Sequence, residues 1–243
     1  MDRQEQVLLN GLQEENRDFT VFPSDAADQF RAQDGKLVNA SAGQEYRAFV
    51  LPMCEALPIE TARLLEAYVR QGGNLAILEK VPRYAMKREQ DGELKELMER
   101  ILAYPQTVFF ETVDTRQVLE WLEAVCPREL RILEGIRTCK KNFAHYPDWV
   151  IDPYIHTGED LDGISWTVFE GERTNYYFVN YTDREQEIVA EVPSGMRPEI
   201  WDSLTGEIRE ADVLEKGAGA VYRVRMRLPK GYGIFLVTSK SIA

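Results

Sequence analysis

Residues 46–82 hold two apolar segments separated by an amphipathic one. Arg47–Leu51 is nearly all apolar, which is typical of a strand covered on both faces. Residues 59–71 place apolar side chains at helical spacing, namely Ala62, Leu65, Tyr68 and Val69. Gly72 is suited to the left-handed end of that helix, and Leu75–Leu78 follows as a second buried strand. A strand, a crossover helix and a second strand predict a parallel sheet.

The same alternation of elements extends to residue 126. Amphipathic spacing predicts helices, and short apolar segments predict strands. The further helices are predicted at 2–16, 89–102 and 115–125, and the further strands at 18–22, 36–39 and 108–110. Helices that alternate with strands indicate a doubly wound α/β domain over residues 1–126.

The pattern changes after Pro127, where short strands alternate with turns. The clearest strand is 221–228, in which Tyr222, Val224, Met226 and Leu228 alternate with three arginines. The other strands are predicted at 131–133, 165–169, 175–180, 187–192, 199–201, 208–210 and 232–237. Residues 127–243 are therefore predicted to form an antiparallel β-sandwich, with 138–163 as an irregular connection.

Charge and composition exclude several kinds of partner. The net charge is −12, and the 12 acids and 10 bases from residue 165 onward leave −10 for residues 1–164. This acidic balance argues against nucleic acid, which needs a basic surface. No apolar run approaches the length of a membrane span, and no signal peptide is recognisable. We therefore expect no membrane partner and a cytoplasmic location by default.

Few residues have the pattern of a catalytic or metal site. Cys54 follows a predicted buried strand, where a nucleophile could lie, but Pro52–Ala56 lacks a glycine-flanked elbow. His145 and His156, 11 residues apart among several acids, lack helical metal-ligand spacing. None of the 41 acids stands out as one of a glycosidase pair. We expect no catalytic residue, no metal and no cofactor, and a buried structural thiol at Cys54.

The predicted sandwich is rich in aromatic residues, and sugar rings stack on exposed aromatic faces because their C–H surfaces are apolar. Alternation sends about half of these aromatic side chains into the core, where we expect Trp201. The candidate carbohydrate contacts are Trp166, Tyr176 and Tyr181.

Several motifs, in this order, resemble the non-catalytic C-terminal region of α-L-rhamnosidase-type glycoside hydrolases. They are Asp18–Phe22, Asp34–Val38, Tyr46–Pro52, Asn175–Asn180 and Pro198–Glu207. The first half also resembles the flavodoxin-like trimerisation domain of some β-galactosidases. That domain is related to class I glutamine amidotransferases but lacks their catalytic residues.

The resemblance implies a non-catalytic accessory or scaffold region whose catalytic barrel is absent from this chain. The implied partners are the missing catalytic domain or a second copy of the chain, with a carbohydrate as a further candidate. Two alternatives stay open: a stand-alone carbohydrate-binding module that uses the sandwich aromatics, and an amidotransferase-like hydrolase that uses Cys54.

Limited proteolysis tests the predicted division of the chain. A protease of broad specificity is expected to cut first between residues 138 and 163 and to leave two stable fragments, because each domain has its own core. Mass spectrometry of the fragments identifies the cut. Early cleavage inside residues 46–126, with no stable product, would contradict the two-domain prediction.

Overall fold

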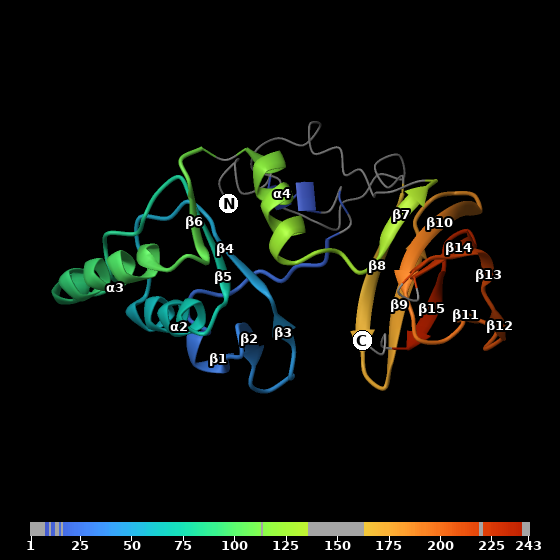
Figure 1. Cartoon of the computed structure of the whole chain (residues 1–243), viewed down its shortest axis with the longest axis horizontal. Helices are drawn as coiled ribbons and strands as arrows, with labels where there is room; N and C mark the ends of the chain where they lie inside the picture. The colour runs from blue at the N-terminus through green and yellow to red at the C-terminus, as the bar shows by residue number, and fades with distance from the viewer. Residues whose placement is uncertain are drawn as a thin grey trace. The chain divides into compact units, whose positions relative to one another are not determined.

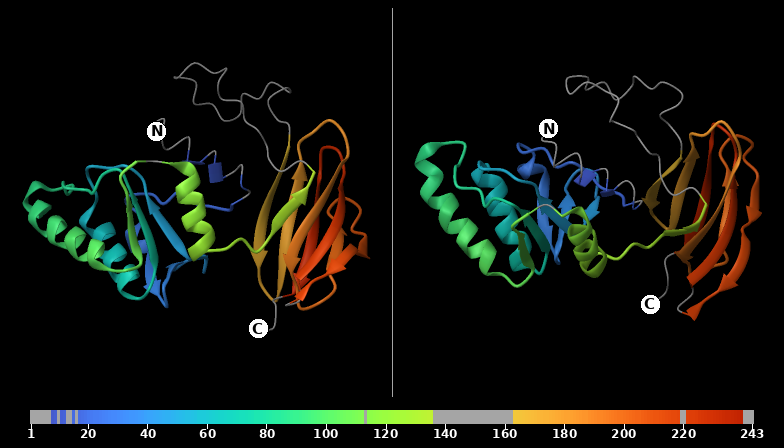
Figure 2. Two further views of the ribbon diagram at one scale, coloured as in Figure 1. Left: turned by 45° about the horizontal axis from the view of Figure 1, so that its top comes forward. Right: turned by 90° about the horizontal axis from the view of Figure 1, so that it is seen from above.

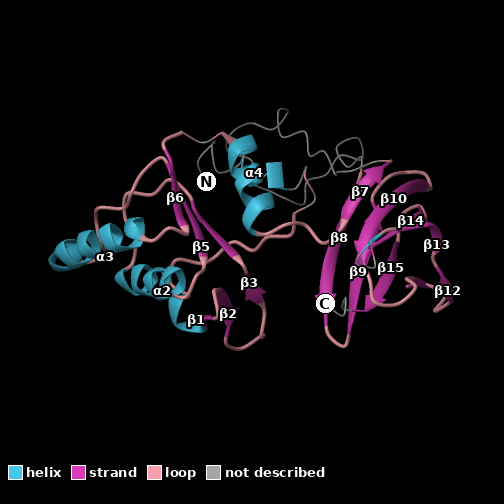
Figure 3. Ribbon diagram, in the orientation of Figure 1, coloured by secondary structure: helices cyan, strands magenta, loops and turns pink. Residues whose placement is uncertain are grey.

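The computed structural model describes residues 8–9, 11–12, 15, 17–112, 114–135, 163–218 and 221–239. The chain forms two compact units: Met1–Gly11 with Phe19–Pro127, and Leu12–Asp18 with Arg128–Ala243 (Figures 1 and 3). The second unit thus includes residues 12–18, which the sequence pattern assigns to the first domain. The Arg128 guanidinium holds this segment, because it donates to the Glu15 carbonyl oxygen at 2.9 Å and to the Glu15 carboxylate at 2.7 Å.

The first unit contains an α/β layer, as the sequence predicts. Its parallel sheet has the order β4-β5-β6, with β4 at Ala48–Leu51, β5 at Asn74–Leu78 and β6 at Thr107–Phe110. The helices are α2 (Ile59–Arg70), α3 (Asp91–Ala103, preceded by η2 at Arg88–Gln90) and α4 (Thr115–Val125). Figures 1 and 2 show α2 and α3 on one face of this sheet and α4 on the other. The three described strands lie side by side in the same order as in the sequence. They do not show the reversal of strand order that marks a doubly wound sheet.

A small antiparallel sheet precedes the parallel one. It contains β1 (Phe30–Gln33, after η1 at Ala27–Gln29), β2 (Lys36–Asn39) and β3 (Glu45–Tyr46). The predicted strand at 18–22 is wrong, since these residues have no regular secondary structure. The ring of Phe22 instead packs on Phe30 and Phe49, with centroid distances of 4.9 and 5.5 Å. Phe22 thus packs against other rings although its segment joins no ladder.

Tyr68 connects α2 to the parallel sheet. Its side chain is fully buried, and its hydroxyl lies 3.0 and 3.1 Å from the carbonyl oxygens of Arg47 and Asn74, to which it donates. Burial raises the pKa of this hydroxyl above its ordinary value. Gly72 ends the helix with a φ of 91°, a left-handed conformation that favours glycine. Gly73 is needed for another reason, because a Cβ there would lie 2.1 Å from the Tyr68 ring.

The second unit is a β-sandwich of two antiparallel sheets. The four-stranded sheet has the order β13 (Asp212–Lys216), β14 (Val221–Leu228), β10 (Gln186–Pro193), β7 (Arg131–Glu134). The five-stranded sheet has the order β12 (Ile208–Glu210), β11 (Glu199–Asp202), β15 (Gly233–Ser239), β9 (Arg173–Asn180), β8 (Ile164–Glu170). Side chains from both sheets share one core, including Phe178 and Leu236 from one and Val224 and Met226 from the other.

The strands predicted after Pro127 are confirmed, and β13 is an addition. Its sequence is largely polar and its side chains are mostly exposed, so it has no apolar pattern. All but Gly163 of the predicted connection at 138–163 lies outside the described residues. Most of the predicted helix at 2–16 also does, although Leu8–Leu9 and Gly11–Leu12 are helical. None of the described helices combines the length and apolar content needed to cross a membrane.

A methyl group at Gly73 tests the packing of Tyr68. We expect Gly73→Ala to lower the unfolding free energy of the first unit by about 2 kcal/mol, because the ring must move out of its buried site. The measurement is urea unfolding followed by circular dichroism of the helices, which report on this unit. Gly92→Ala in α3 is the matched control, since a Cβ there meets nothing within 4 Å and should not destabilise the helix. Equal stability of the two variants would contradict the packing described.

Candidate functional site

A row of side chains crosses the outer face of the five-stranded sheet. Register pairs Trp201 of β11 with Phe235 of β15, and Phe235 with Tyr177 of β9. The row is extended by Ile208 of β12, the partner of Trp201, and by Thr167 of β8, the partner of Tyr177. Directly opposed residues in antiparallel strands point to the same face. One residue from each strand therefore lies in this row, which we call the aromatic row.

The aromatic row lies outside the sandwich core because its sequence neighbours lie inside. Ile200, Leu236 and Tyr176 are at most 2% exposed and belong to the core. Side chains alternate between the two faces of a strand. The residues beside these three in their strands, Trp201, Phe235 and Tyr177, therefore face outward. These three rings are half-buried. With strands roughly 4.8 Å apart, they span about 10 Å of the sheet.

Packing holds two of the rings in place. The centroids of Tyr177 and Phe235 are 4.6 Å apart, with 34° between the ring planes. Tyr177 also lies close to the backbone at Gly233, where an added Cβ would come within 2.5 Å of the ring. A glycine in a strand interior commonly marks such a close approach. The outward rings are therefore fixed before any ligand binds.

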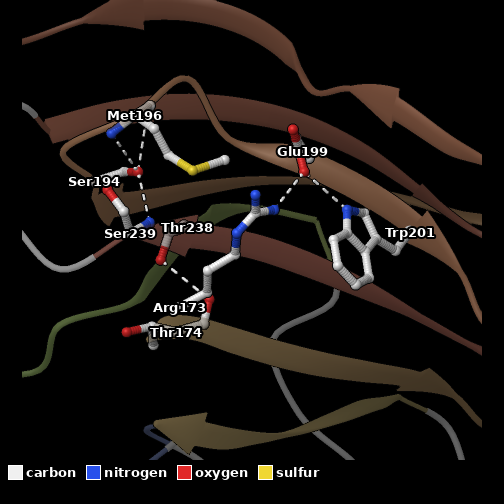
Figure 4. Close-up of polar contacts among 8 residues, drawn as sticks. All are labelled: Arg173, Thr174, Ser194, Met196, Glu199, Trp201, Thr238 and Ser239. Atoms are coloured by element: carbon white, nitrogen blue, oxygen red, sulfur yellow. Dashed lines mark hydrogen bonds and ion pairs between the residues drawn. The ribbon is translucent and has the colours of Figure 1, made fainter. Parts of the chain in front are cut away.

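An ion pair holds the third ring (Figure 4). Glu199 accepts hydrogen bonds at the same carboxylate oxygen from the Trp201 indole Nε1, at 2.9 Å, and from Arg173 Nη1, at 3.0 Å. The guanidinium carbon of Arg173 lies 5.7 Å from the centroid of the indole, within the range of a cation–π contact. Arg173 extends from β9 to β11 across β15, and Val237 on that face of β15 is fully buried. Arg173 and Glu199 thus fix the orientation of the indole.

Hydrogen bonds also fix the strand ends beside this ion pair (Figure 4). The buried Ser194 hydroxyl donates to the Met196 carbonyl oxygen at 2.7 Å, and its oxygen accepts from the Ser239 amide at 3.3 Å. The Thr238 hydroxyl donates to the Thr174 carbonyl oxygen at 3.2 Å. These contacts join the end of β15 to its neighbours, so the ion pair lies on a firmly bonded part of the sheet.

A capped turn follows β11. The Asp202 carboxylate accepts from the amides of Thr205, at 2.8 Å, and Leu204, at 2.9 Å, and from the Tyr232 hydroxyl at 3.3 Å. These hydrogen bonds, led by the one from the Thr205 amide, hold the pKa of the Asp202 carboxyl below its ordinary value. Asp202 thus fixes the turn as an anion.

The three residues predicted to contact carbohydrate differ in their exposure to solvent. Tyr181 is 45% exposed, and its hydroxyl oxygen accepts from the Ser165 hydroxyl at 3.2 Å. Trp166 is half-buried against the core, and its buried Nε1 has no hydrogen-bond partner in the part of the chain that the structure describes. Tyr176 is 2% exposed, and burial raises the pKa of its hydroxyl. Carbohydrate contact stays a prediction, and Tyr181 is the member of this set with the most accessible ring.

The expectation that Trp201 lies in the core is wrong. Its neighbour Ile200 fills the core and directs the indole outward. Arg173 and Glu199 were not among the predicted site residues, because they meet only through strand pairing, 26 residues apart in sequence. Burial alternates strictly over 173–180, with Thr174, Tyr176, Phe178 and Asn180 buried, and this places Tyr177 on the outer face. The residue types in this strand do not alternate in the same way, so the sequence contains no clear signal for it.

The other chemical candidates do not assemble into a reactive centre within the described residues. Cys54, just after β4, packs against the core of the first unit. Both histidines, His145 and His156, lie outside the described residues. No group of three possible metal-ligating side chains occurs among the residues described. In the same loop as Cys54, the hydrogen bond from Lys80 and its positive charge lower the pKa of the exposed Glu55 carboxyl.

Solved structures of glycoside hydrolases share the fold. A rhamnosidase from Novosphingobium sp. PP1Y matches with a TM-score of 0.60 and 19% identity, over 89% of this chain and 19% of that chain. A catalytic mutant of a GH42 β-galactosidase from G. stearothermophilus matches with a TM-score of 0.50 and 10% identity, over 98% of this chain and 36% of that one. No protein-family model matches the sequence, and no curated protein matches it. The chain thus spans less than two fifths of the length of either solved protein.

The pKa of Asp202 predicts a pH dependence for the sandwich. The unfolded carboxyl titrates near pH 3.9, and the folded one titrates lower. Its contribution to stability is therefore complete above about pH 4 and is lost as the pH falls through the folded pKa. Thermal unfolding of the chain and of Asp202→Asn between pH 7 and pH 2.5 measures it. We expect the advantage of the unmodified chain to shrink below about pH 4, and a difference that is constant with pH would contradict this.

Proposed function

We propose that this chain is a non-catalytic accessory region of a glycoside-hydrolase-like protein whose catalytic barrel lies outside these 243 residues. The main observation behind this proposal is the coverage of the match with the rhamnosidase structure. The match covers 89% of this chain but only 19% of the rhamnosidase chain. An α/β layer followed by a β-sandwich would then correspond to a part of a larger enzyme. Its role would be to brace or orient the part that performs the chemistry.

The proposal includes a more specific origin for each unit. The first unit would be a flavodoxin-like domain of the class I amidotransferase type that lacks a nucleophile. The position of Cys54 supports this, because the thiol packs against the core next to Pro52 instead of standing on a glycine-flanked turn. The second unit would be the sandwich that ends α-L-rhamnosidase-type enzymes.

The electrostatics of the described carboxyl groups support a role without bond cleavage. Glycoside hydrolysis needs a general acid whose pKa is raised so that it keeps its proton near neutrality. Glu55 and Asp202, which have displaced pKa values, are both shifted downward by hydrogen-bond donors. Carboxyl groups of this kind stay ionised and suit structural hydrogen bonds.

Exposed apolar side chains on the first unit support a contact with another protein surface. Phe109 on β6 is 41% exposed, and β6 is an edge strand of the parallel sheet among the residues that the structure describes. Tyr84 and Met86, in the segment between β5 and α3, are 56% and 72% exposed. Large apolar side chains and an open strand edge favour burial against a partner. We propose the catalytic domain, or a second copy of the chain, as that partner.

A second candidate function is a stand-alone carbohydrate-binding module. The aromatic row favours it, since flat rings fixed on a sheet surface suit sugar binding. The two functions are compatible, because bracing would use the first unit and sugar binding the sandwich.

Hydrolysis assays and the gene context together test the proposed function. The purified chain is expected to hydrolyse 4-nitrophenyl α-L-rhamnopyranoside and β-D-galactopyranoside no faster than buffer alone does, because the proposal places the catalytic carboxylates in the missing barrel. An active β-galactosidase assayed in parallel is the positive control. A neighbouring or continuous reading frame is expected to encode a barrel with two catalytic carboxylates. Saturable hydrolysis that co-elutes with the purified chain would contradict the proposal.

A further inference from the structure

We propose that the outer face of the five-stranded sheet binds a neutral oligosaccharide stacked on Trp201, Phe235 and Tyr177. This inference goes beyond the accessory role, because a region that braces a catalytic domain needs no ligand of its own. It also moves the predicted sugar contact from the set Trp166, Tyr176 and Tyr181 to three other aromatic residues.

The apolar centre of the face matches the apolar faces of sugar rings. Trp201, Phe235 and Tyr177 are consecutive across three neighbouring strands, so their rings form a strip about 10 Å long. A strip of this length accommodates more than one pyranose ring. The rings are held by the contact between Tyr177 and Phe235 and by the hydrogen bond from Trp201 to Glu199. Binding therefore costs little side-chain ordering, which raises affinity for a given contact area.

Hydrogen-bonding groups line both sides of the strip, where the hydroxyl groups of a sugar would lie. On one side, the register places Asn175 and Glu199 in the next row, with Arg173 beyond them. On the other side, the row includes Ser165 of β8, which bonds Tyr181, and Ser203 follows β11. A predominantly apolar surface with a few fixed polar groups is the usual composition of a site for a small ligand.

Arg173 is a charged group close to the strip. Its guanidinium lies over the edge of the aromatic row, and Glu199 accepts a hydrogen bond from Nη1. A guanidinium has five N–H donors, so hydrogen bonds to sugar hydroxyls are compatible with the ion pair. Its side chain is 46% exposed, so the guanidinium is accessible to a sugar bound beside it.

The charges on the face favour a neutral ligand over an anionic one. Arg173 is compensated by Glu199, and Glu210, at the end of that row, pairs with Arg197 at 3.0 Å. The chain as a whole has a net charge of −12, which repels polyanions. Single-stranded nucleic acid also stacks on aromatic rows, but it requires a basic groove beside them. A neutral oligosaccharide satisfies the stacking surface without an uncompensated charge.

A glycan array that carries neutral and anionic oligosaccharides tests the proposal with the full chain. We expect neutral oligosaccharides to bind and anionic ones to bind more weakly or not at all. Isothermal titration calorimetry with the best neutral trisaccharide on the array then measures the affinity of the chain and its variants. Thermal unfolding of each variant confirms that it is folded.

The variants distinguish the contribution of ring stacking to the binding affinity from other contributions. Trp201→Leu and Tyr177→Leu keep apolar bulk but remove a flat ring, so each is expected to weaken binding roughly three- to tenfold. Tyr177→Phe keeps the ring and is the matched control, with affinity expected within about twofold. Leu214→Ala removes an exposed apolar side chain from β13 of the other sheet and is expected to change nothing. Tyr181→Ala reports whether the neighbouring exposed tyrosine contributes.

Three results would overturn the proposal: no neutral glycan binds, only anionic glycans bind, or both leucine variants bind as tightly as the unmodified chain. None of these results bears on the accessory role, which is tested by hydrolysis and gene context. Conversely, hydrolysis by the chain would contradict the accessory role while leaving glycan binding on the aromatic row intact.

Discussion

The alternation of side chains in β9, with its register against β15, determines the surface of the sandwich. Seven residue pairs join the two strands, from Gly233 opposite Val179 to Ser239 opposite Arg173. This register turns Tyr176 and Phe178 into the core and Tyr177 outward. A slip of one residue would exchange the two sets and would place Arg173 and Tyr177 inside. Gly233 supports the observed register, since the Tyr177 ring requires a residue without a Cβ at that point.

The first unit depends on a comparable local requirement. Tyr68 fills the space where α2 meets the beginnings of β4 and β5, and its hydroxyl bonds carbonyl oxygens beside both strands. The two glycines that follow the helix have separate roles, one in backbone conformation and one in ring packing. Each unit thus has its own core and its own packing contacts that hold its strands and helices in place. This independence suits a region that supports a larger protein.

Much of the fold could be predicted from the sequence because its elements have strong local patterns. The stripe on α2 and the alternation in β14 both survive in the structure. The prediction of secondary structure failed where contacts between segments far apart in the sequence determine it. Residues 18–22 form no strand, and Phe22 packs instead on the rings of Phe30 and Phe49. The polar β13 is a strand because it pairs with the edge of β14.

The candidate site was less accessible to prediction than the fold. Alternation shows that Ile200 and Trp201 face opposite ways, but the sequence does not show which of the two faces the core. The aromatic row requires the order of the strands in the sheet, since β11, β15 and β9 are neighbours in space and not in sequence. The bond from Arg173 to Glu199 depends on the same strand order.

The rings of Trp201, Phe235 and Tyr177 face solvent on the outer side of the sheet, whereas Tyr176 and Phe178 face the core. Solvent paramagnetic relaxation enhancement measures this directly, with a neutral soluble gadolinium complex and the aromatic C–H resonances of the full chain. The account predicts strong enhancement for Trp201, Phe235 and Tyr177 and little for Tyr176 and Phe178, which are at most 2% exposed. Strong enhancement of Tyr176 and Phe178 with protected Trp201, Phe235 and Tyr177 would contradict it.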